Sequence, residues 1–220
     1  MFMKKETYFR VDTIHQNSRN MLAAVNKFRH RHTGFSLSQN HSALLVLDMQ
    51  AYFLEEQSHA FIPSSTAILP GIIKLVETFY KFQRPVFFTR HINSSQDAGL
   101  MTTWWNDLIH QDNPTSEIIP ELDVSKGIVL IKNQYDAFLN TNLQEALHAI
   151  EVSQLVICGV MTHLCCESTA RSAFMRGFEV FFTIDGTATY TEDFHRATLL
   201  NLSHGFAIPL LMDEVLQVFS

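Results

Sequence analysis

The chain has 220 residues, of which 46% are hydrophobic and 17% are charged, and its formal net charge is −6. This length and apolar content suit one large domain with a full core. The acidic balance argues against a nucleic-acid-binding protein, and no apolar run approaches membrane-spanning length. Three cysteines, two of them adjacent, make no disulfide framework. Because residues 1–12 also lack the apolar segment of a secretory signal, we expect a cytoplasmic protein that acts on a small molecule.

The first 40 residues carry charge of the opposite sign. Seven basic and two acidic residues give them a net charge of +5, which leaves −11 for the rest of the chain, whose total is −6. These residues are Lys4, Lys5, Arg10, Arg19, Lys27, Arg29 and Arg31 against Glu6 and Asp12. We expect residues 1–40 to form a basic arm that packs on the body of the chain or on a second subunit. Residues 41–220 should then form the main domain.

Short apolar runs rich in Val, Ile, Leu and Phe predict buried β-strands. They occupy residues 43–47, 85–89, 127–131, 154–158, 179–184 and 205–209. The apolar residues in these runs are continuous rather than alternating, which is typical of strands that are covered on both faces.

The segments between these runs have the spacing of helices. They include residues 65–82, 142–150, 164–177 and 193–203, and the apolar positions of the first are Ile68, Ile72, Leu75 and Phe79. Strands that alternate with helices form a parallel sheet with helices on both sides. We therefore predict a three-layer α/β/α sandwich, Rossmann-like, with a sheet of about six strands. The connection over residues 90–126 is long, and such insertions often serve as lids or binding loops.

Chemically reactive residues follow several of the predicted strands. Asp48 follows the first strand, His91 lies just after the second, Lys132 follows the third, and residues 159–166 follow the fourth. Ligands in such sheets bind outside the carboxyl ends of the strands. Alone, an Asp can cap a helix, a Lys can be solvated, and adjacent cysteines can pack in a core. Together, an acid, a base and a thiol on one rim provide the components of an activated cysteine.

Helical geometry distinguishes the two adjacent cysteines. If a helix begins near Leu164, Cys166 belongs to an apolar stripe that should face the sheet. The stripe consists of Cys166, Ala170, Ala173 and Phe174. Cys165 lies about 100° away from it, in the first turn, where the unpaired N–H groups of a helix N-terminus acidify a thiol. We therefore assign Cys165 as the candidate nucleophile and Cys166 as a core residue.

Three segments, in this order and spacing, resemble the isochorismatase-like cysteine hydrolases. This family includes nicotinamidases, N-carbamoylsarcosine amidohydrolases, ureidoacrylate hydrolases and isochorismatases. The segments are VLDMQAYF (46–53), LIKNQYDAF (130–138) and CGVMTHLCCESTARSAFMRGFEV (158–180). The resemblance extends from Ala43 to Pro209, so it implies that residues 41–220 are a hydrolase domain of this family.

Carried over to this chain, the resemblance implies a catalytic triad of Asp48, Lys132 and Cys165. Asp48 would take the thiol proton as a general base and then donate it to the leaving group. Lys132 would hold the pair and favour the thiolate electrostatically. The family also has a cis peptide before the nucleophile, which here falls between Val160 and Met161. The backbone N–H groups of Met161 and Cys165 would then form an oxyanion hole.

The resemblance also constrains the reaction. Nicotinamidases of the family bind a metal through an Asp-x-His-type motif after the second strand, but this chain reads TRHINSSQ (89–96) there. This difference implies no metal and no other cofactor, and it disfavours nicotinamide. Isochorismatases carry glycine at the position of Cys165 and cleave a vinyl ether without a thiol. The thiol of this chain therefore favours hydrolysis of a C–N bond in a small amide, ureide or carbamoyl compound through a thioester.

Two other functions stay open at this point. The first is an isochorismatase-type vinyl-ether hydrolase that uses Asp48 as an acid. The second is a non-catalytic binding protein on the same fold. The residues expected to contact a small, partly apolar or planar substrate are Phe53, His91, Trp104, Trp105 and Tyr135. The resemblance further implies a homo-oligomer, either a dimer or a tetramer.

Overall fold

The computed structural model describes residues 4–32, 34–105 and 107–220. The strands are β1 (Ser42–Leu47), β2 (Val86–His91), β3 (Ile128–Lys132), β4 (Gln154–Val160), β5 (Glu179–Ala188) and β6 (Ile208–Leu210). The α-helices are α1 (Ile14–Arg29), α2 (Ala51–Leu54), α3 (Ser65–Lys81), α4 (Met101–Trp104), α5 (Leu143–Ala149), α6 (Glu167–Met175), α7 (Glu192–Gly205) and α8 (Met212–Val218). Two 3-10 turns, Gln39–His41 and Pro114–Ser116, and a π-helical turn, Thr162–Cys166, complete the described elements.

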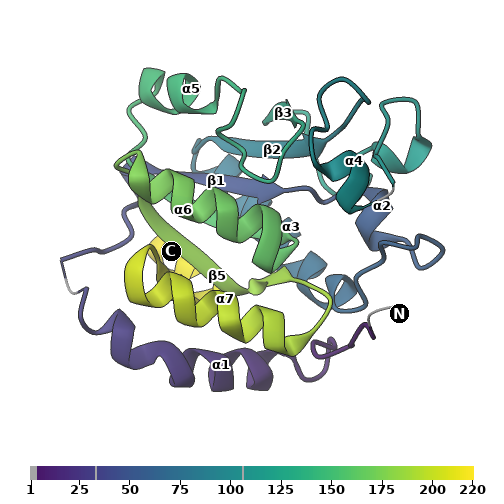
Figure 1. Cartoon of the computed structure of the whole chain (residues 1–220). Helices are drawn as coiled ribbons and strands as arrows, with labels where there is room; N and C mark the ends of the chain where they lie inside the picture. The colour runs from purple at the N-terminus through teal and green to yellow at the C-terminus, as the bar shows by residue number, and fades with distance from the viewer. Residues whose placement is uncertain (1–3, 33, 106) are drawn as a thin grey trace.

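The strands form one parallel, six-stranded sheet in the order β3-β2-β1-β4-β5-β6. Helices α6 and α7 lie in front of the sheet and α3 lies behind it (Figure 1). The predicted three-layer α/β/α sandwich is thus confirmed. The chain moves outward from β1 to β3 and then returns to place β4 on the other side of β1. Such a reversal opens a crevice at the carboxyl ends of the two central strands.

Burial explains why the predicted runs form strands, with one exception. Every residue of β1 and β4 is buried, as expected for central strands of a parallel sheet. In β3, by contrast, the side chains of Ile128, Val129 and Ile131 are 45%, 43% and 56% exposed. The expectation that all runs are covered on both faces is wrong for β3, because no described helix packs extensively against it, whereas α1 and α7 cover the other edge strand, β6.

The apolar stripes of two helices test the predicted helical spacing. The stripe of α3 is fully buried at Ile68, Ile72, Leu75 and Phe79. In the segment that ends in α6, Cys166, Ala170 and Ala173 are fully buried as well. Phe174 is 46% exposed, so its assignment to the stripe was wrong. Eight residues at 100° each place it about 80° around the helix from Cys166, at the margin of the buried face.

The N-terminal arm packs on the body of the same chain. Tyr8 and Phe9 are buried in the main core, and α1 contacts α7, β5 and β6. Residues 1–3 and 33 of the arm lie outside the described residues. In the described parts of the chain, the helices are too short or too polar to cross a membrane.

A buried acid in β5 should give the stability of the fold a measurable pH dependence. Asp185 accepts a hydrogen bond from the backbone N–H of Met212 at 2.8 Å, and burial raises the pKa of Asp185 to about 6 from 3.8. The folded state therefore binds the proton more tightly, and the contribution of Asp185 to stability rises as the pH falls through 6. Between pH 7.5 and 5, we expect wild type to gain about 1 kcal/mol relative to the Asp185→Asn variant.

Urea unfolding of both proteins at the two pH values measures this gain. Asparagine keeps an acceptor for the N–H of Met212 but does not titrate. The matched control is Asp12→Asn, because Asp12 is exposed in the arm, and its difference from wild type should not change with pH. A constant difference for Asp185→Asn would contradict the prediction.

Candidate functional site

The carboxyl ends of strands β1 to β4 bring the predicted reactive residues together. Asp48 follows β1, His91 and Lys132 are the last residues of β2 and β3, and Cys165 lies in the π-helical turn after β4. Adjacent parallel strands end at the same edge of a sheet, and the pairing places His91 directly opposite Lys132. All four side chains are buried. The predicted triad and His91 thus form one buried cluster.

Lys132 occupies the centre of this cluster. Its Nζ lies 2.8 Å from Asp48 Oδ2, 3.1 Å from His91 Nδ1, 3.4 Å from Cys165 Sγ and 3.0 Å from the carbonyl oxygen of Gln134. Burial opposes the charge of the ammonium, but Asp48 and Cys165 outweigh it and hold the pKa of Lys132 above its usual value. Lys132 is therefore cationic at neutral pH and touches both the acid and the thiol.

Asp48 is held as an oriented carboxylate. Its Oδ1 accepts a hydrogen bond from Thr89 Oγ1 at 2.6 Å, and its backbone N–H donates to the same hydroxyl at 3.1 Å. The backbone of Asp48 has a φ of +50°, in the left-handed region that most residues avoid. Burial opposes ionisation, but the charge of Lys132 outweighs it, so the pKa of Asp48 lies below its usual value. Asp48 is thus ionised at neutral pH.

His91 is a neutral partner of the cluster. Its Nδ1 accepts from the ammonium of Lys132, so its Nε2 carries the proton and donates to Asn93 Oδ1 at 2.8 Å. Burial, together with the charge of Lys132, lowers the pKa of His91 to about 4. The imidazole therefore orients Lys132 without adding a second positive charge.

The proton of the Asp48–Cys165 pair lies on the sulfur. Burial raises the pKa of the Cys165 thiol above its usual value, the charge of Asp48 raises it further, and Lys132 opposes both. The expectation of a thiol acidified by a helix N-terminus is therefore wrong for the free protein. The physical reason is that Cys165 sits in a buried π-helical turn before α6, beside a carboxylate that keeps the proton on sulfur.

This protonation state predicts slow alkylation of Cys165 in the free protein. Since the thiolate is the reactive form, the labelling rate with iodoacetamide should stay low from pH 6 to 8 and rise without a plateau up to pH 9. Intact-protein mass spectrometry and peptide mapping measure the rate at each pH, and glutathione labelled in parallel gives the behaviour of an ordinary thiol. Fast labelling of Cys165 that levels off below pH 7 would contradict the assignment.

The turn that carries Cys165 has two further predicted features. The peptide bond between Val160 and Met161 is cis, as the resemblance implies. Cys166 is fully buried in the main core, in agreement with its assignment as a packing residue. The role of the Met161 and Cys165 backbone N–H groups as an oxyanion hole stays a prediction.

Cys165 opens onto a cavity of about 270 Å³. Phe53, His91, Trp105 and Tyr135 line it, and Trp105 Nε1 donates a hydrogen bond to Tyr135 Oη at 2.6 Å. Trp104 does not line it, and its side chain is 76% exposed. The expectation for Trp104 is therefore wrong, because neighbouring side chains at the end of a helix point about 100° apart.

Sequence reasoning missed several residues of this cavity. Tyr52 donates a hydrogen bond to Asp107 Oδ2 at 2.7 Å, and His59 Nε2 lies 3.2 Å from the same oxygen. Lys5 also lines the cavity, although it belongs to the basic arm. Tyr52 stands beside Phe53 in the VLDMQAYF segment, so its position could have been found. No local pattern links Lys5 to Cys165, 160 positions later in the chain.

The cluster does not fit a metal ion. Among the described residues, Asp48, His91 and Cys165 are the group whose ligand atoms come within 4.8 Å of one another. The ammonium of Lys132 lies 2.8 Å from Asp48 Oδ2, 3.1 Å from His91 Nδ1 and 3.4 Å from Cys165 Sγ. It therefore occupies the position where a cation bound by all three would sit, and its own charge would repel that cation.

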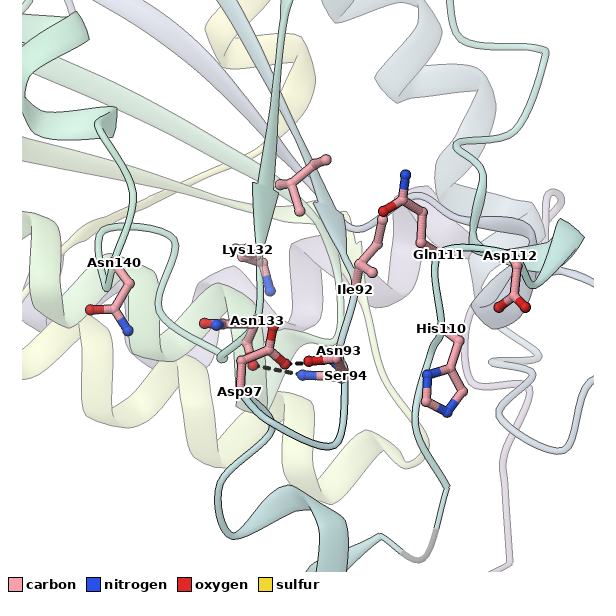
Figure 2. Close-up of a pocket in the computed structure, with 11 residues that line it drawn as sticks. Ile92, Asn93, Ser94, Asp97, His110, Gln111, Asp112, Lys132, Asn133 and Asn140 are labelled. Carbon is pink, nitrogen blue, oxygen red and sulfur yellow. Dashed lines mark hydrogen bonds between the residues drawn. The ribbon is translucent and has the colours of Figure 1, made fainter.

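A second, more open pocket of about 710 Å³ adjoins the cluster at the same rim (Figure 2). Its lining is mostly polar, and two hydrogen bonds hold it together, from Asn93 Nδ2 to the carbonyl oxygen of Asn133 and from the Ser94 N–H to Asp97 Oδ1. The pocket shares Asn93 with the cavity that Cys165 lines. It therefore borders the hydrogen bond that fixes the tautomer of His91.

Comparisons with known proteins agree with this geometry. The family model described as Isochorismatase domain matches residues 42–214. The chain is 44% identical over 181 residues to Nicotinamidase 3 of Arabidopsis thaliana, covering 79% of this chain and 86% of that protein. It is 31% identical to the isochorismatase of Bacillus subtilis over 81% of this chain but spans only 58% of the length of that relative.

A solved structure extends the comparison to the fold. A cysteine hydrolase from Pseudomonas syringae pv. phaseolicola superposes with a TM-score of 0.80 at 26% identity, covering 84% of this chain and 95% of that chain. The family match covers all the catalytic candidates from Asp48 to Cys165. This chain therefore belongs to the isochorismatase-like hydrolase family.

Proposed function

We propose that this hydrolase cleaves the C–N bond of a small amide, ureide or carbamoyl compound through a thioester on Cys165. The observation that carries the proposal is the placement of Lys132, with its Nζ 2.8 Å from Asp48 and 3.4 Å from Cys165, at a cavity that reaches the thiol. An acid, a thiol and a fixed cation in contact are the components of nucleophilic catalysis by cysteine.

The protonation states define the sequence of steps. The Cys165 thiol passes its proton to ionised Asp48 as the sulfur attacks the substrate carbonyl, which forms a C–S bond and a tetrahedral oxyanion. Asp48 then gives that proton to the nitrogen, the C–N bond breaks and the amine or ammonia leaves. Water next attacks the thioester, Asp48 accepts its proton, the C–S bond breaks and the sulfur regains the proton. Lys132 stabilises the thiolate that forms transiently in both halves.

The cavity supports a small planar substrate. Phe53, Trp105 and Tyr135 supply aromatic walls, and about 270 Å³ leaves room for a single ring with its amide. The absence of the Asp-x-His motif was the reason to disfavour nicotinamide. That reason is outweighed by the 44% identity to a protein named Nicotinamidase 3, so nicotinamide belongs with benzamide and ureides in the first substrate panel.

Trapping the acyl group on Cys165 tests the proposal. The protein is mixed with each amide, quenched in acid within seconds and mapped by mass spectrometry. We expect the mass of the acyl group on the peptide that holds Cys165, together with release of ammonia. The thioester route would be contradicted if wild type released ammonia without any acylated peptide and a variant that lacks Cys165 still released ammonia.

Vinyl-ether hydrolysis is the second candidate, and the 31% identity to the Bacillus subtilis isochorismatase favours it. That reaction needs Asp48 as a proton donor, but the lowered pKa of Asp48 makes the free carboxyl a poor donor at neutral pH. We therefore place this activity second. A homo-oligomeric state and a cytoplasmic location stay predictions.

A further inference from the structure

The basic arm contributes a charged side chain to the catalytic cavity. Lys5 lines the cavity together with Cys165 and Tyr190. Its Nζ donates hydrogen bonds to the carbonyl oxygens of His59 and Phe61 at 2.5 and 2.8 Å, and it lies 4.3 Å from the ring centroid of Tyr190. An ammonium has three N–H donors. The two carbonyl oxygens fix the orientation of the Lys5 ammonium and leave one donor for another partner.

The backbone around Lys5 is fixed, so this placement is built into the fold. The N–H of Glu6 donates to the carbonyl oxygen of Tyr190 at 2.8 Å, and the N–H of Glu192 donates to Glu6 Oε2 at 3.0 Å. Two residues later, the hydroxyl of Tyr8 accepts from the N–H of Thr189 at 2.9 Å. The arm is thereby attached to the segment that follows β5, which supplies one wall of the cavity.

The charge of Lys5 has no anionic partner within residues 4–32, 34–105 and 107–220. Partial burial lowers the pKa of Lys5, and charges removed from water are normally paired. Asp107, the acidic residue in the lining of the cavity, already accepts a hydrogen bond from Tyr52 and lies beside His59. The cavity therefore presents an oriented ammonium that forms no ion pair with a carboxylate of the described residues.

We propose that Lys5 is a substrate-binding residue that recognises a carboxylate on the end of the amide substrate away from the scissile bond. This inference rests on the proposed amide hydrolysis and narrows it to small amides that carry a carboxylate. The carbonyl would meet Cys165 while the carboxylate pairs with Lys5, so both ends of the substrate are held. Because the family match begins at residue 42, this selectivity comes from a segment outside the family domain.

Matched amides on one ring test the inference. We would measure kcat/KM of wild type and of the Lys5→Met variant for 3-carbamoylbenzoate, 4-carbamoylbenzoate and benzamide. Methionine keeps the length and apolar stem of lysine without its charge. For at least one carbamoylbenzoate, the ratio of its kcat/KM to that of benzamide should fall about tenfold to a hundredfold in Lys5→Met, mainly through KM. The Lys4→Met variant, an exposed neighbour in the arm, should keep the wild-type ratio.

Binding separates this inference from the proposed function. Calorimetry on the Cys165→Ala protein should show tighter binding of a carbamoylbenzoate than of benzamide, and Lys5→Met in that background should remove the difference. If binding follows this pattern but wild type hydrolyses no amide, the inference holds and the proposed function fails. If Lys5→Met lowers kcat/KM for the carbamoylbenzoates and for benzamide by the same factor, Lys5 has only a structural role and the inference is overturned. Failure of both carbamoylbenzoates to bind or react also overturns it.

Discussion

Replacing Cys165 with alanine is expected to lower kcat for a small amide by at least about a thousandfold, because removing the nucleophile of a covalent mechanism leaves only binding and oxyanion stabilisation. The remaining cluster should stay intact, since Lys132 keeps Asp48, His91 and the Gln134 carbonyl as partners. Steady-state ammonia release from the best amide of the panel measures the loss. Hydrolysis of a vinyl ether such as isochorismate, which needs no thiol, should survive the same change.

The adjacent cysteine provides the control. Cys166 is fully buried in the core and does not line the cavity, so Cys166→Ala should cost some stability and leave amide hydrolysis close to wild type. If Cys166→Ala abolished hydrolysis while Cys165→Ala retained it, the assignment of the nucleophile would be reversed. Full amide hydrolysis by Cys165→Ala would exclude the thioester.

Replacing Lys132 with methionine is expected to lower the free energy of unfolding by about 3–5 kcal/mol, because it leaves Asp48 as a buried carboxylate without its cation. Protonation of Asp48 limits the cost, so the deficit should shrink as the pH falls. Amide hydrolysis should be lost as well, since Asp48 would then hold the proton it has to accept. Urea unfolding at pH 7.5 and 5.5, with kcat at the same pH values, measures both effects.

The double variant Asp48→Asn/Lys132→Met shows whether the pair causes the loss. Asparagine tolerates the left-handed backbone at position 48 and keeps an acceptor for Thr89. With neither charge present, most of the stability lost in Lys132→Met should return while hydrolysis stays absent. A double variant no more stable than Lys132→Met would show that the loss does not come from the unpaired charge of Asp48.

Much of the fold and of the cluster could be predicted from the sequence, for a physical reason. Continuous apolar runs separated by helical spacing leave few arrangements other than a parallel sheet covered on both sides, and that sheet fixes which strand ends lie together. The positions of Asp48, Lys132 and His91 follow from this rule alone. Cys165 required the geometry of the following turn as well.

The remaining features depend on contacts distant in sequence or on solvation. Lys5 reaches the cavity only because Tyr8 and Phe9 are buried in the core of the main domain, and no local pattern encodes that contact. Trp104 and Trp105 are adjacent residues of the same type, so the sequence does not show which of the two rings faces the cavity. The raised pKa of the Cys165 thiol reflects full burial beside Asp48, which outweighs the effect of a helix terminus that sequence spacing suggested.

Lys132 sits at the end of β3, the edge strand whose only neighbour in the sheet is β2, whereas Asp48 and the cysteine turn follow central strands. Separation of β3 from β2 breaks a single ladder of hydrogen bonds. It exposes little additional apolar surface, because the side chains of Ile128, Val129 and Ile131 are already partly exposed to solvent. This local opening would withdraw the ammonium and leave the acid and thiol in place. The backbone amides of β3 should therefore exchange with deuterium before those of β1 and β4. The protein should also lose catalysis while most of its core is still folded.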